Sequence, residues 1–266
     1  RRPSHIGPNA FKRGLAQGAV SASGLFKPGT RRVIVKARYT RQKAGELGAA
    51  RAHLRYIQRD GVTREGEPGR LYDAAGDDAD GQAFLARSEH DPHQFRFIVS
   101  AEDSERLADL KPVIRDLMQQ MERDLGTKLD WIAVDHFNTG HPHTHVVVRG
   151  RDDRGQDLVM ARDYIGHGIR ARAQDLMTLE LGPETEIERV TKLTREVVQE
   201  RFTLLDRNLM ARAKDNVLAI TSADEADHSR RALRVGRLKT LERMGLAQER
   251  RPGVWQLDAE LDGKLR

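Results

Sequence analysis

The chain has 266 residues, of which 38% are hydrophobic and 32% carry a charge, a balance typical of a globular protein with one medium and one smaller domain. No apolar run approaches the roughly 18 residues of a membrane span, so we expect no membrane insertion. Cysteine is absent, which excludes disulfides and thiolate metal sites and fits a reducing, cytoplasmic compartment. The chain begins with Arg1 and has no signal-peptide pattern, so we expect a fragment.

Positive charge is concentrated at the start of the chain. The net charge is +6, and the first 45 residues contain eleven Lys or Arg and no acid. Such an acid-free segment suggests contact with phosphate groups. Over residues 1–29, however, scattered Gly, Pro and Ser are equally typical of a solvated, disordered segment. Both interpretations stay open for this basic flexible arm.

The next segments predict a strand, a helix and a loop. Residues 32–39 alternate apolar with basic side chains, which predicts a strand with one wet, cationic face. Apolar residues at helical spacing predict a helix over 46–59, ended by Asp60-Gly61. Residues 61–92 are rich in Gly, Asp and Pro and predict mostly loop.

The middle of the chain predicts a second strand and a long amphipathic helix. The strand covers residues 95–100 (FRFIVS) and the helix residues 102–125. Pro112 falls inside the helix pattern, which favours a kink or a helix start near Lys111.

An α+β fold follows from the order of the elements. Residues 130–136 and 143–149 predict the two strands of a hairpin, 158–160 a short further strand, and 162–181 a helix. Runs of both element types favour an antiparallel central sheet with helices packed on it, in a two-layer sandwich. We expect this first domain to cover residues 30–182.

The C-terminal part has a distinct, basic character. Residues 183–222 predict a linker and a connecting helix. From Ser229 to Arg251 there are eight basic residues and two acids, in a helix followed by a turn between short strands. This order resembles the recognition helix and wing of winged helix-turn-helix domains, so we expect residues 223–266 to bind DNA. The alternative is an amphipathic helix hairpin that only packs on the first domain.

The most informative motif is a cluster of histidines on the predicted hairpin. Four of the ten histidines lie within residues 136–145. Alternate residues of a strand project to one face, so His143 and His145 point the same way, and the hairpin brings His136 opposite them. Three protein ligands would leave coordination positions open for a substrate. His141 lies before Pro142 and is not assigned as a ligand.

Two other classes of metal-dependent hydrolase fit the motif poorly. Metallo-β-lactamase-type enzymes need an Asp soon after the His-x-His pair, where this chain has Val146-Val-Val. Two-histidine phosphoesterases need a second His-x-Ser/Thr copy, and His228-Ser-Arg has the wrong form.

The spacing of His136 and His143-Thr-His145 before an apolar strand resembles the third motif of HUH endonucleases. The surroundings are most similar to conjugative relaxases, the mobilisation class that includes the T-DNA border nicking enzyme. In that family the nucleophilic tyrosine lies in a Leu-x-Tyr-Leu-x-Arg-x-Gly context, which Leu54-Arg-Tyr56-Ile-Gln-Arg59-Asp-Gly61 resembles. The resemblance covers about residues 32–180.

The resemblance also implies roles for single residues. Tyr56 would be the nucleophile, and Ser100, at the end of an apolar strand, would match the family's second motif. Many members carry His-x-Asp where this chain has Asn138, so either Asn138 or Asp135 would orient the first ligand. Asp135 or His141 is also a candidate to help Tyr56 ionise, because a free tyrosine has a pKa near 10. Tyr39, Tyr72 and Tyr164 match the nucleophile's position less well.

The function implied is metal-dependent nicking of single-stranded DNA at a transfer origin, through a 5′-phosphotyrosyl intermediate. Imidazoles favour zinc, copper, nickel or manganese over magnesium, whereas the resemblance implies Mg²⁺ or Mn²⁺. The alternatives are a rolling-circle replication initiator or transposase of the same superfamily, and a non-catalytic winged-helix regulator. The expected DNA contacts are Ser100, Arg59, Arg32, Lys36, Arg38, Arg234, Arg237, Lys239, Arg250 and Arg251.

The resemblance alone also implies partners and a place of action. They are an accessory DNA-binding protein and a type IV secretion coupling protein. The location would be the bacterial cytoplasm, with export attached to DNA as a further possibility.

Overall fold

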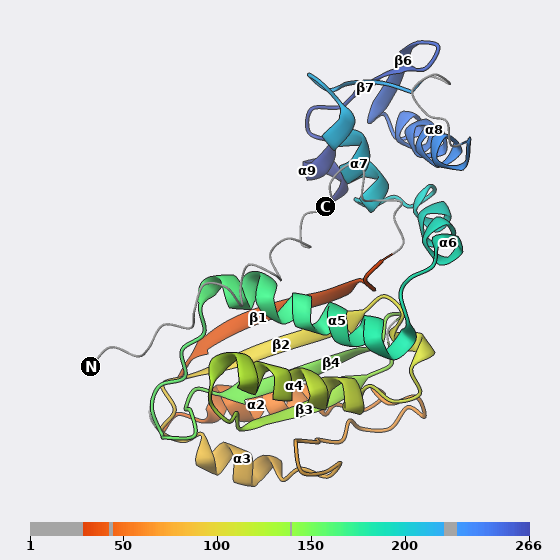
Figure 1. Cartoon of the computed structure of the whole chain (residues 1–266). Coiled ribbons are helices and arrows are strands. Elements are labelled where there is room, and N and C mark those ends of the chain that lie inside the picture. The colour runs from red at the N-terminus through yellow and green to blue at the C-terminus, as the bar shows by residue number, and fades with distance from the viewer. Residues whose placement is uncertain (1–28, 43–44, 139, 221–227) are drawn as a thin grey trace. The chain divides into compact units, whose positions relative to one another are not determined.

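The computed structural model of the chain describes residues 29–42, 45–138, 140–220 and 228–266 (Figure 1). The basic arm expected over residues 1–29 lies, apart from Gly29, outside the described residues. The chain forms two compact units, of which the first includes Thr30–Pro183 and the second Glu184–Arg266. The first boundary lies within one residue of the expected one.

The first unit is built on a four-stranded antiparallel sheet. Its strands are β1 (Val33–Arg41), β2 (His93–Ala101), β3 (Trp131–His136) and β4 (His143–Arg149), in the order β1-β2-β4-β3. All four correspond to strands expected from alternating or continuous apolar residues. The hairpin of β3 and β4 therefore lies at one edge of the sheet, and β1 lies at the other.

Helices cover both faces of this sheet, which corrects the expected two-layer sandwich to three layers. One face packs on α4 (Lys111–Leu125) and α5 (Ile169–Leu181), which lie side by side across it (Figure 1). The opposite face packs on α2 (Gly48–Ile57) and α3 (Gly81–Arg87). Apolar residues of α2 contact Ile132, Val134 and Val147 of the hairpin strands, so this second layer lies over β3 and β4.

The structure corrects two local expectations and confirms a third. α3 lies inside the segment that was expected to be loop. Asp80 stabilises the start of this helix by accepting hydrogen bonds from the backbone N–H groups of Gln82 and Ala83. α4 starts at Lys111, as one of the two expectations from Pro112 had it, with proline in its first turn, where no backbone donor is lost. Residues 158–160 form no strand, and the nearest pairing is a single bridge between Arg151 and Asp157.

The second unit combines helices with a small antiparallel sheet of order β5-β7-β6. Its elements are α6 (Glu186–Glu196), α7 (Leu204–Arg212), β5 (Val217–Ala219), α8 (His228–Arg243), β6 (Ala247–Arg251), β7 (Val254–Leu257) and α9 (Leu261–Leu265). Trp255 packs with Leu238 and Leu241 of α8 in its main core.

Residues 183–222 are not a linker with one connecting helix. They hold α6, α7 and β5, which belong to the same unit as α8. Thr185 and Glu188 form a capping box at the start of α6, and Thr203 and Asp206 form another at α7. A Thr followed three residues later by an acid is a signal for a helix start. This signal occurs twice in the segment that was expected to be a linker.

Candidate metal centre

The structure brings His136, His143 and His145 together on the face of the sheet that carries α2. His136 lies directly opposite His143 in the β3–β4 register. The ring centroids are 5.3 Å apart for His136 and His143, 4.4 Å for His136 and His145, and 5.1 Å for the other pair. One nitrogen from each ring lies within 4.8 Å of the others. This cluster, the histidine triad, could bind a metal ion.

In two triad members, one ring nitrogen is hydrogen-bonded to a backbone carbonyl. His136 donates from Nε2 to the carbonyl oxygen of Ile57 at 2.6 Å, and His143 donates from Nδ1 to that of His141 at 3.1 Å. A carbonyl only accepts hydrogen bonds, so the hydrogen of each ring is on the nitrogen turned toward the backbone. The opposite nitrogen then presents its lone pair. Such outer contacts are the usual way to fix a histidine ligand's tautomer.

The surroundings of His136 fit a bound cation. His136 is fully buried, and among the described residues its Nδ1 atom has no hydrogen-bond partner. A buried polar atom without a partner is costly, and a metal ion shared with the other two imidazoles would satisfy it. The carbonyl of Ile57 orients this ligand, and neither Asn138 nor Asp135, the two residues expected to do so, is the partner.

Burial keeps two members of the triad in the form that binds metals. Desolvation, followed by the nearby His136 and His143, lowers the pKa of His145 to about 3. Desolvation also lowers the pKa of His136, partly opposed by its hydrogen bond to Ile57. Both imidazoles are therefore neutral near pH 7, and no proton has to be displaced from them when a metal binds.

Asp135 does not belong to this site, which corrects its expected catalytic role. It lies between two triad-face positions of β3 and so projects to the opposite face of the sheet, across from Thr144. Its carboxylate accepts hydrogen bonds from the hydroxyl of Tyr72 at 2.9 Å and from that of Thr144 at 2.6 Å. Burial raises its pKa to about 6. The sheet itself separates Asp135 from Tyr56.

Tyr56 lies on the exposed side of α2, one residue before the carbonyl that holds His136. Its side chain is 57% exposed, while Leu54 and Ile57 of the same helix are buried against the sheet. The guanidinium carbon of Arg59 lies 4.7 Å from the centre of its ring. Arg59 is also close enough to lower the pKa of His136 and His145. Arg59 thus lies near both Tyr56 and the triad.

The other three tyrosines are buried or lie against the core on the opposite face of the sheet. Tyr72 is completely buried and Tyr164 is 4% exposed, with its hydroxyl bonded to Asp124. Tyr39 is exposed but contacts Phe95, whose side chain belongs to the core under α4 and α5.

His53 was not singled out from the sequence. It lies one helical turn before Tyr56, and the two rings are stacked with centroids 6.4 Å apart. Its pKa is lowered to about 4, first by burial and then by the charges of Arg96 and Arg38. The spacing of three residues within one predicted helix was the available signal, because such residues share a face.

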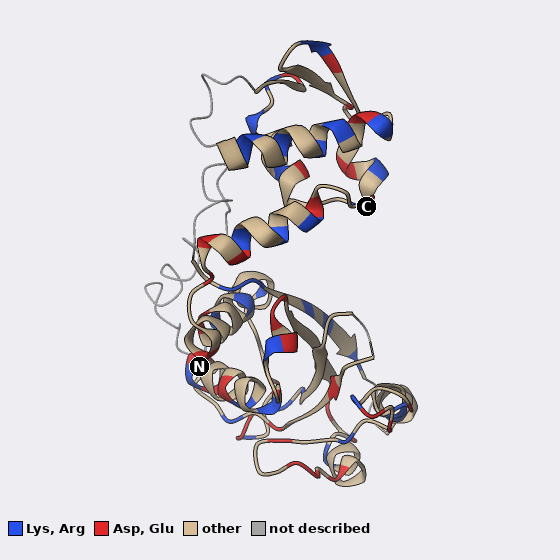
Figure 2. Ribbon diagram, turned by 90° about the vertical axis from the view of Figure 1, so that its right-hand side faces the viewer, with Lys and Arg blue, Asp and Glu red and all other residues tan. Residues whose placement is uncertain are grey.

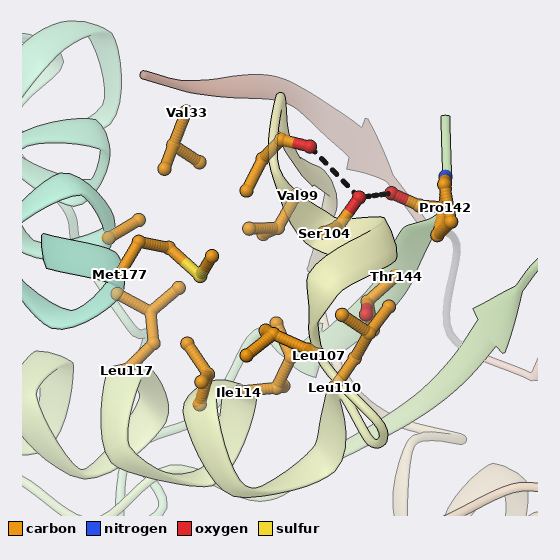
Figure 3. A pocket seen from close by; sticks show the side chains of 13 residues that line it. Val33, Val99, Ser104, Leu107, Leu110, Ile114, Leu117, Pro142, Thr144 and Met177 are labelled. Atoms are coloured by element: carbon orange, nitrogen blue, oxygen red, sulfur yellow. Dashed lines mark hydrogen bonds between the residues drawn. The ribbon is translucent and has the colours of Figure 1, made fainter. Parts of the chain in front are cut away.

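Ser104, which was not expected in the site, contacts the loop that leads into β4. Ser104 is buried and its hydroxyl lies 2.8 Å from the carbonyl oxygen of Pro142 and 2.9 Å from that of Ala101 (Figure 3). Ser100, the expected match to the second motif, lies 3.5 Å from the same Pro142 oxygen. The apolar side chains around Ser104 line a cavity of about 20 Å³, the size of a single water. Ser104 thereby fixes the residue before His143.

The expected DNA-contacting residues divide into exposed and engaged ones. Lys36, Arg38 and Arg59 are exposed or half-exposed near the triad face, whereas Arg32 forms an ion pair with Glu102 at 2.6 Å. Figure 2 shows basic and acidic residues mixed over both units, so charge alone does not mark one DNA-binding face.

Two arginines of α8 are not available to DNA, which corrects their expected role. Arg237 is completely buried and pairs with the equally buried Asp206 at 2.7 Å. Arg234 is 4% exposed and its Nε donates to Asn208 at 2.8 Å. Both face α7, so their sequence pattern reflects the core of the second unit. Lys239, Arg250 and Arg251 are exposed.

A scan against models of protein families found no match, and a search of curated proteins found none either. No helix within the described ranges is long and apolar enough to cross a bilayer.

Proposed function

We propose that the chain is a metal-dependent endonuclease and strand transferase of the relaxase type, which nicks single-stranded DNA through Tyr56. One observation carries the proposal. The helix that presents Tyr56 also supplies, from the next residue, the carbonyl that orients His136. Nucleophile and metal ligand are therefore coupled through a single backbone linkage.

The chemistry follows from the groups that this arrangement supplies. A divalent ion held by the triad would withdraw charge from the scissile phosphate as a Lewis acid. The Tyr56 oxygen forms a new bond to phosphorus, and the bond between phosphorus and the 3′ oxygen breaks. The phenol loses its proton to solvent and the 3′ oxygen takes one up. One phosphodiester replaces another, so no water is consumed and the free 3′-hydroxyl can reverse the step.

Arg59 supports this role electrostatically. Its guanidinium carbon lies 4.7 Å from the centre of the Tyr56 ring, where its charge would help to hold the phosphate that Tyr56 attacks. Tyr56 is exposed and so accessible to a strand that approaches the triad. Asp135 has no part in the proposal because it lies across the sheet.

The test is covalent capture of DNA. The protein is incubated with a random-sequence single-stranded library and Mg²⁺, Mn²⁺ or Zn²⁺, then run on a denaturing gel. Wild type should form a metal-dependent protein–DNA adduct, and sequencing of the captured 5′ ends should give the nick site. Tyr56→Phe should form none, while Tyr39→Phe, a control at another exposed tyrosine, should match wild type. An adduct that persists in Tyr56→Phe, or no adduct from wild type with any metal, would refute the proposal.

The regulator hypothesis receives less support. A winged-helix reader would contact DNA through α8, but two of the arginines expected to do so are buried against α7. DNA binding by the second unit without any adduct would favour that alternative. A replication initiator or transposase would share the adduct and would differ in the sequence of the captured ends.

A further inference from the structure

The strip of sheet beside α2 contains two arginines that face each other without an acid between them. Arg38 of β1 and Arg96 of β2 are directly opposite in the antiparallel register. Both lie on the triad face, since Arg96 is two residues from Ile98, which pairs with His145. Like charges directly opposite each other destabilise a sheet.

Neither arginine finds compensation within the part of the chain that the structure describes. No carboxylate there forms an ion pair with either one. Arg96 donates from Nη2 to the side-chain oxygen of Gln94 at 3.3 Å, and its Nε is buried without a partner. The Nε2 of Gln94, a residue that is 0% exposed, is also buried without a partner. A half-buried guanidinium with an unused donor costs free energy.

Two common explanations for surface arginines do not account for this pair. Basic residues often protect an edge strand from pairing with another chain, which would explain Arg38 but not Arg96, because β2 lies between β1 and β4. A solvated charged face would not bury the Nε of Arg96.

We infer that Arg38 and Arg96 together form an anion subsite for one backbone phosphate of the DNA strand, next to the phosphate that reacts at the triad. This inference rests on the proposed function for the identity of the strand. Two planar guanidinium groups suit the oxygens of a phosphate diester, which accept paired hydrogen bonds. Arg96 is one strand and two residues from His145, or roughly 8 Å by strand geometry, a separation suited to a neighbouring phosphate.

His53 fits the same subsite. It lies on α2 beside both arginines, and their charges help to lower its pKa to about 4. This electrostatic effect places the side chain of His53 close to both guanidinium groups. The subsite is thus bounded by β1, β2 and the Tyr56-bearing helix.

The test measures how binding of an oligothymidylate depends on salt, by fluorescence anisotropy in EDTA so that no cleavage occurs. Losing one phosphate contact should lower the slope of log K against log salt by about 0.7 for a single strand. Lowering the salt from 1 M to 0.1 M strengthens binding, and each variant should gain roughly five-fold less affinity over this range than wild type. Arg38→Gln and Arg96→Gln should each show it. Arg123→Gln, an exposed charge on α4 at the opposite face, should not.

The double variant gives the sharpest outcome. If both arginines hold one phosphate, Arg38→Gln/Arg96→Gln should lower the slope by about 0.7 in total, whereas two separate phosphates would give about 1.4 and overturn the shared subsite. Thermal unfolding should show each variant at least as stable as wild type, since a repulsion is removed. Unchanged slopes alongside a normal covalent adduct would reject the subsite and leave the proposed function standing. Lowered slopes in a protein that never forms an adduct would support the subsite and reject the nuclease.

Discussion

His136 donates its Nε2 hydrogen to the carbonyl oxygen of Ile57 across 2.6 Å, and this bond joins two segments that are 79 residues apart in the chain. Ile57 ends the helix that carries Tyr56, and His136 ends β3. The contact fixes the ring so that Nδ1 faces the other two imidazoles. A shift of the helix end would therefore move a nucleophile and a metal ligand together.

Loss of any triad member should abolish tight metal binding. His136→Ala, His143→Ala and His145→Ala each leave two ligands, so we expect at least about a hundred-fold weaker binding of Mn²⁺ or Zn²⁺, which is the upper end of the effect of outer-shell changes. Isothermal titration calorimetry measures this directly. His90→Ala, which removes a histidine outside the triad, is the control and should bind like wild type. Equal affinity in a triad variant would place the metal elsewhere.

Ser104 should position His143 without touching a metal. Ser104→Ala removes the hydroxyl that contacts the Pro142 carbonyl, which frees the residue before His143. We expect metal affinity to fall roughly ten-fold, the scale of outer-shell effects. Ser100→Ala is the matched control, because its contact to the same oxygen is 3.5 Å long and so weak. A larger loss in Ser100→Ala than in Ser104→Ala would reverse these roles.

Asp135 should affect the pH dependence of stability and leave metal binding unchanged. Its pKa is raised from 3.8 to about 6, so the folded state binds the proton more tightly than the unfolded state. The contribution is fully favourable below pH 4 and is lost as the pH rises through 6. Asp135→Asn keeps an acceptor for Tyr72 and Thr144. The variant should therefore be more stable than wild type above pH 6, by on the order of 1–3 kcal/mol.

Urea unfolding of wild type and Asp135→Asn between pH 4 and 8 checks this. The difference between the two proteins is the quantity to compare, because His145 and His53 have lowered pKa values and destabilise the fold as the pH falls below 6.5. Asp77→Asn is the control of opposite sign, since Arg115 and Lys111 lower the pKa of that exposed carboxyl. A difference between Asp135→Asn and wild type that does not change with pH would contradict the buried-carboxylate account.

The sequence predicted the triad well because strand alternation and a hairpin are local rules. His136, His143 and His145 follow from a period of two and a turn of known kind. Strand alternation also predicts that Asp135, next to His136 in β3, faces the opposite side of the sheet. Its expected catalytic role was therefore wrong for a reason that the sequence already contained. The bond from Ile57 to His136 and the pairing of Arg38 with Arg96 depend on register between distant segments, which no local pattern encodes.

In the second unit, the sequence pattern predicted the wrong role for basic residues. Basic residues at helical spacing in α8 predict a DNA-facing surface, yet arginine at such positions also forms buried ion pairs. Asp206, the partner that decides the matter for Arg237, lies 31 residues earlier on α7. Only the tertiary contact distinguishes the two uses.

The buried pair of Arg237 and Asp206 should be essential to the second unit. Arg237 also donates to the backbone carbonyls of Glu196, Val197 and Arg201. Arg237→Met leaves Asp206 as a buried, unpaired charge, and we expect a loss of about 3–5 kcal/mol. Arg251→Met, on the exposed end of β6, should change stability by less than about 0.5 kcal/mol.

The two tryptophans allow the units to be followed separately. Trp131 is buried in the first unit and Trp255 in the second, so Trp131→Phe and Trp255→Phe give proteins with one reporter each. In the Arg237→Met background the Trp255 signal should unfold at lower urea while the Trp131 signal stays in place. The double change Arg237→Met/Asp206→Leu should recover part of the loss, because both charges leave the core together. A double variant as unstable as Arg237→Met would mean that the carbonyl contacts, and not the stranded carboxylate, set the cost.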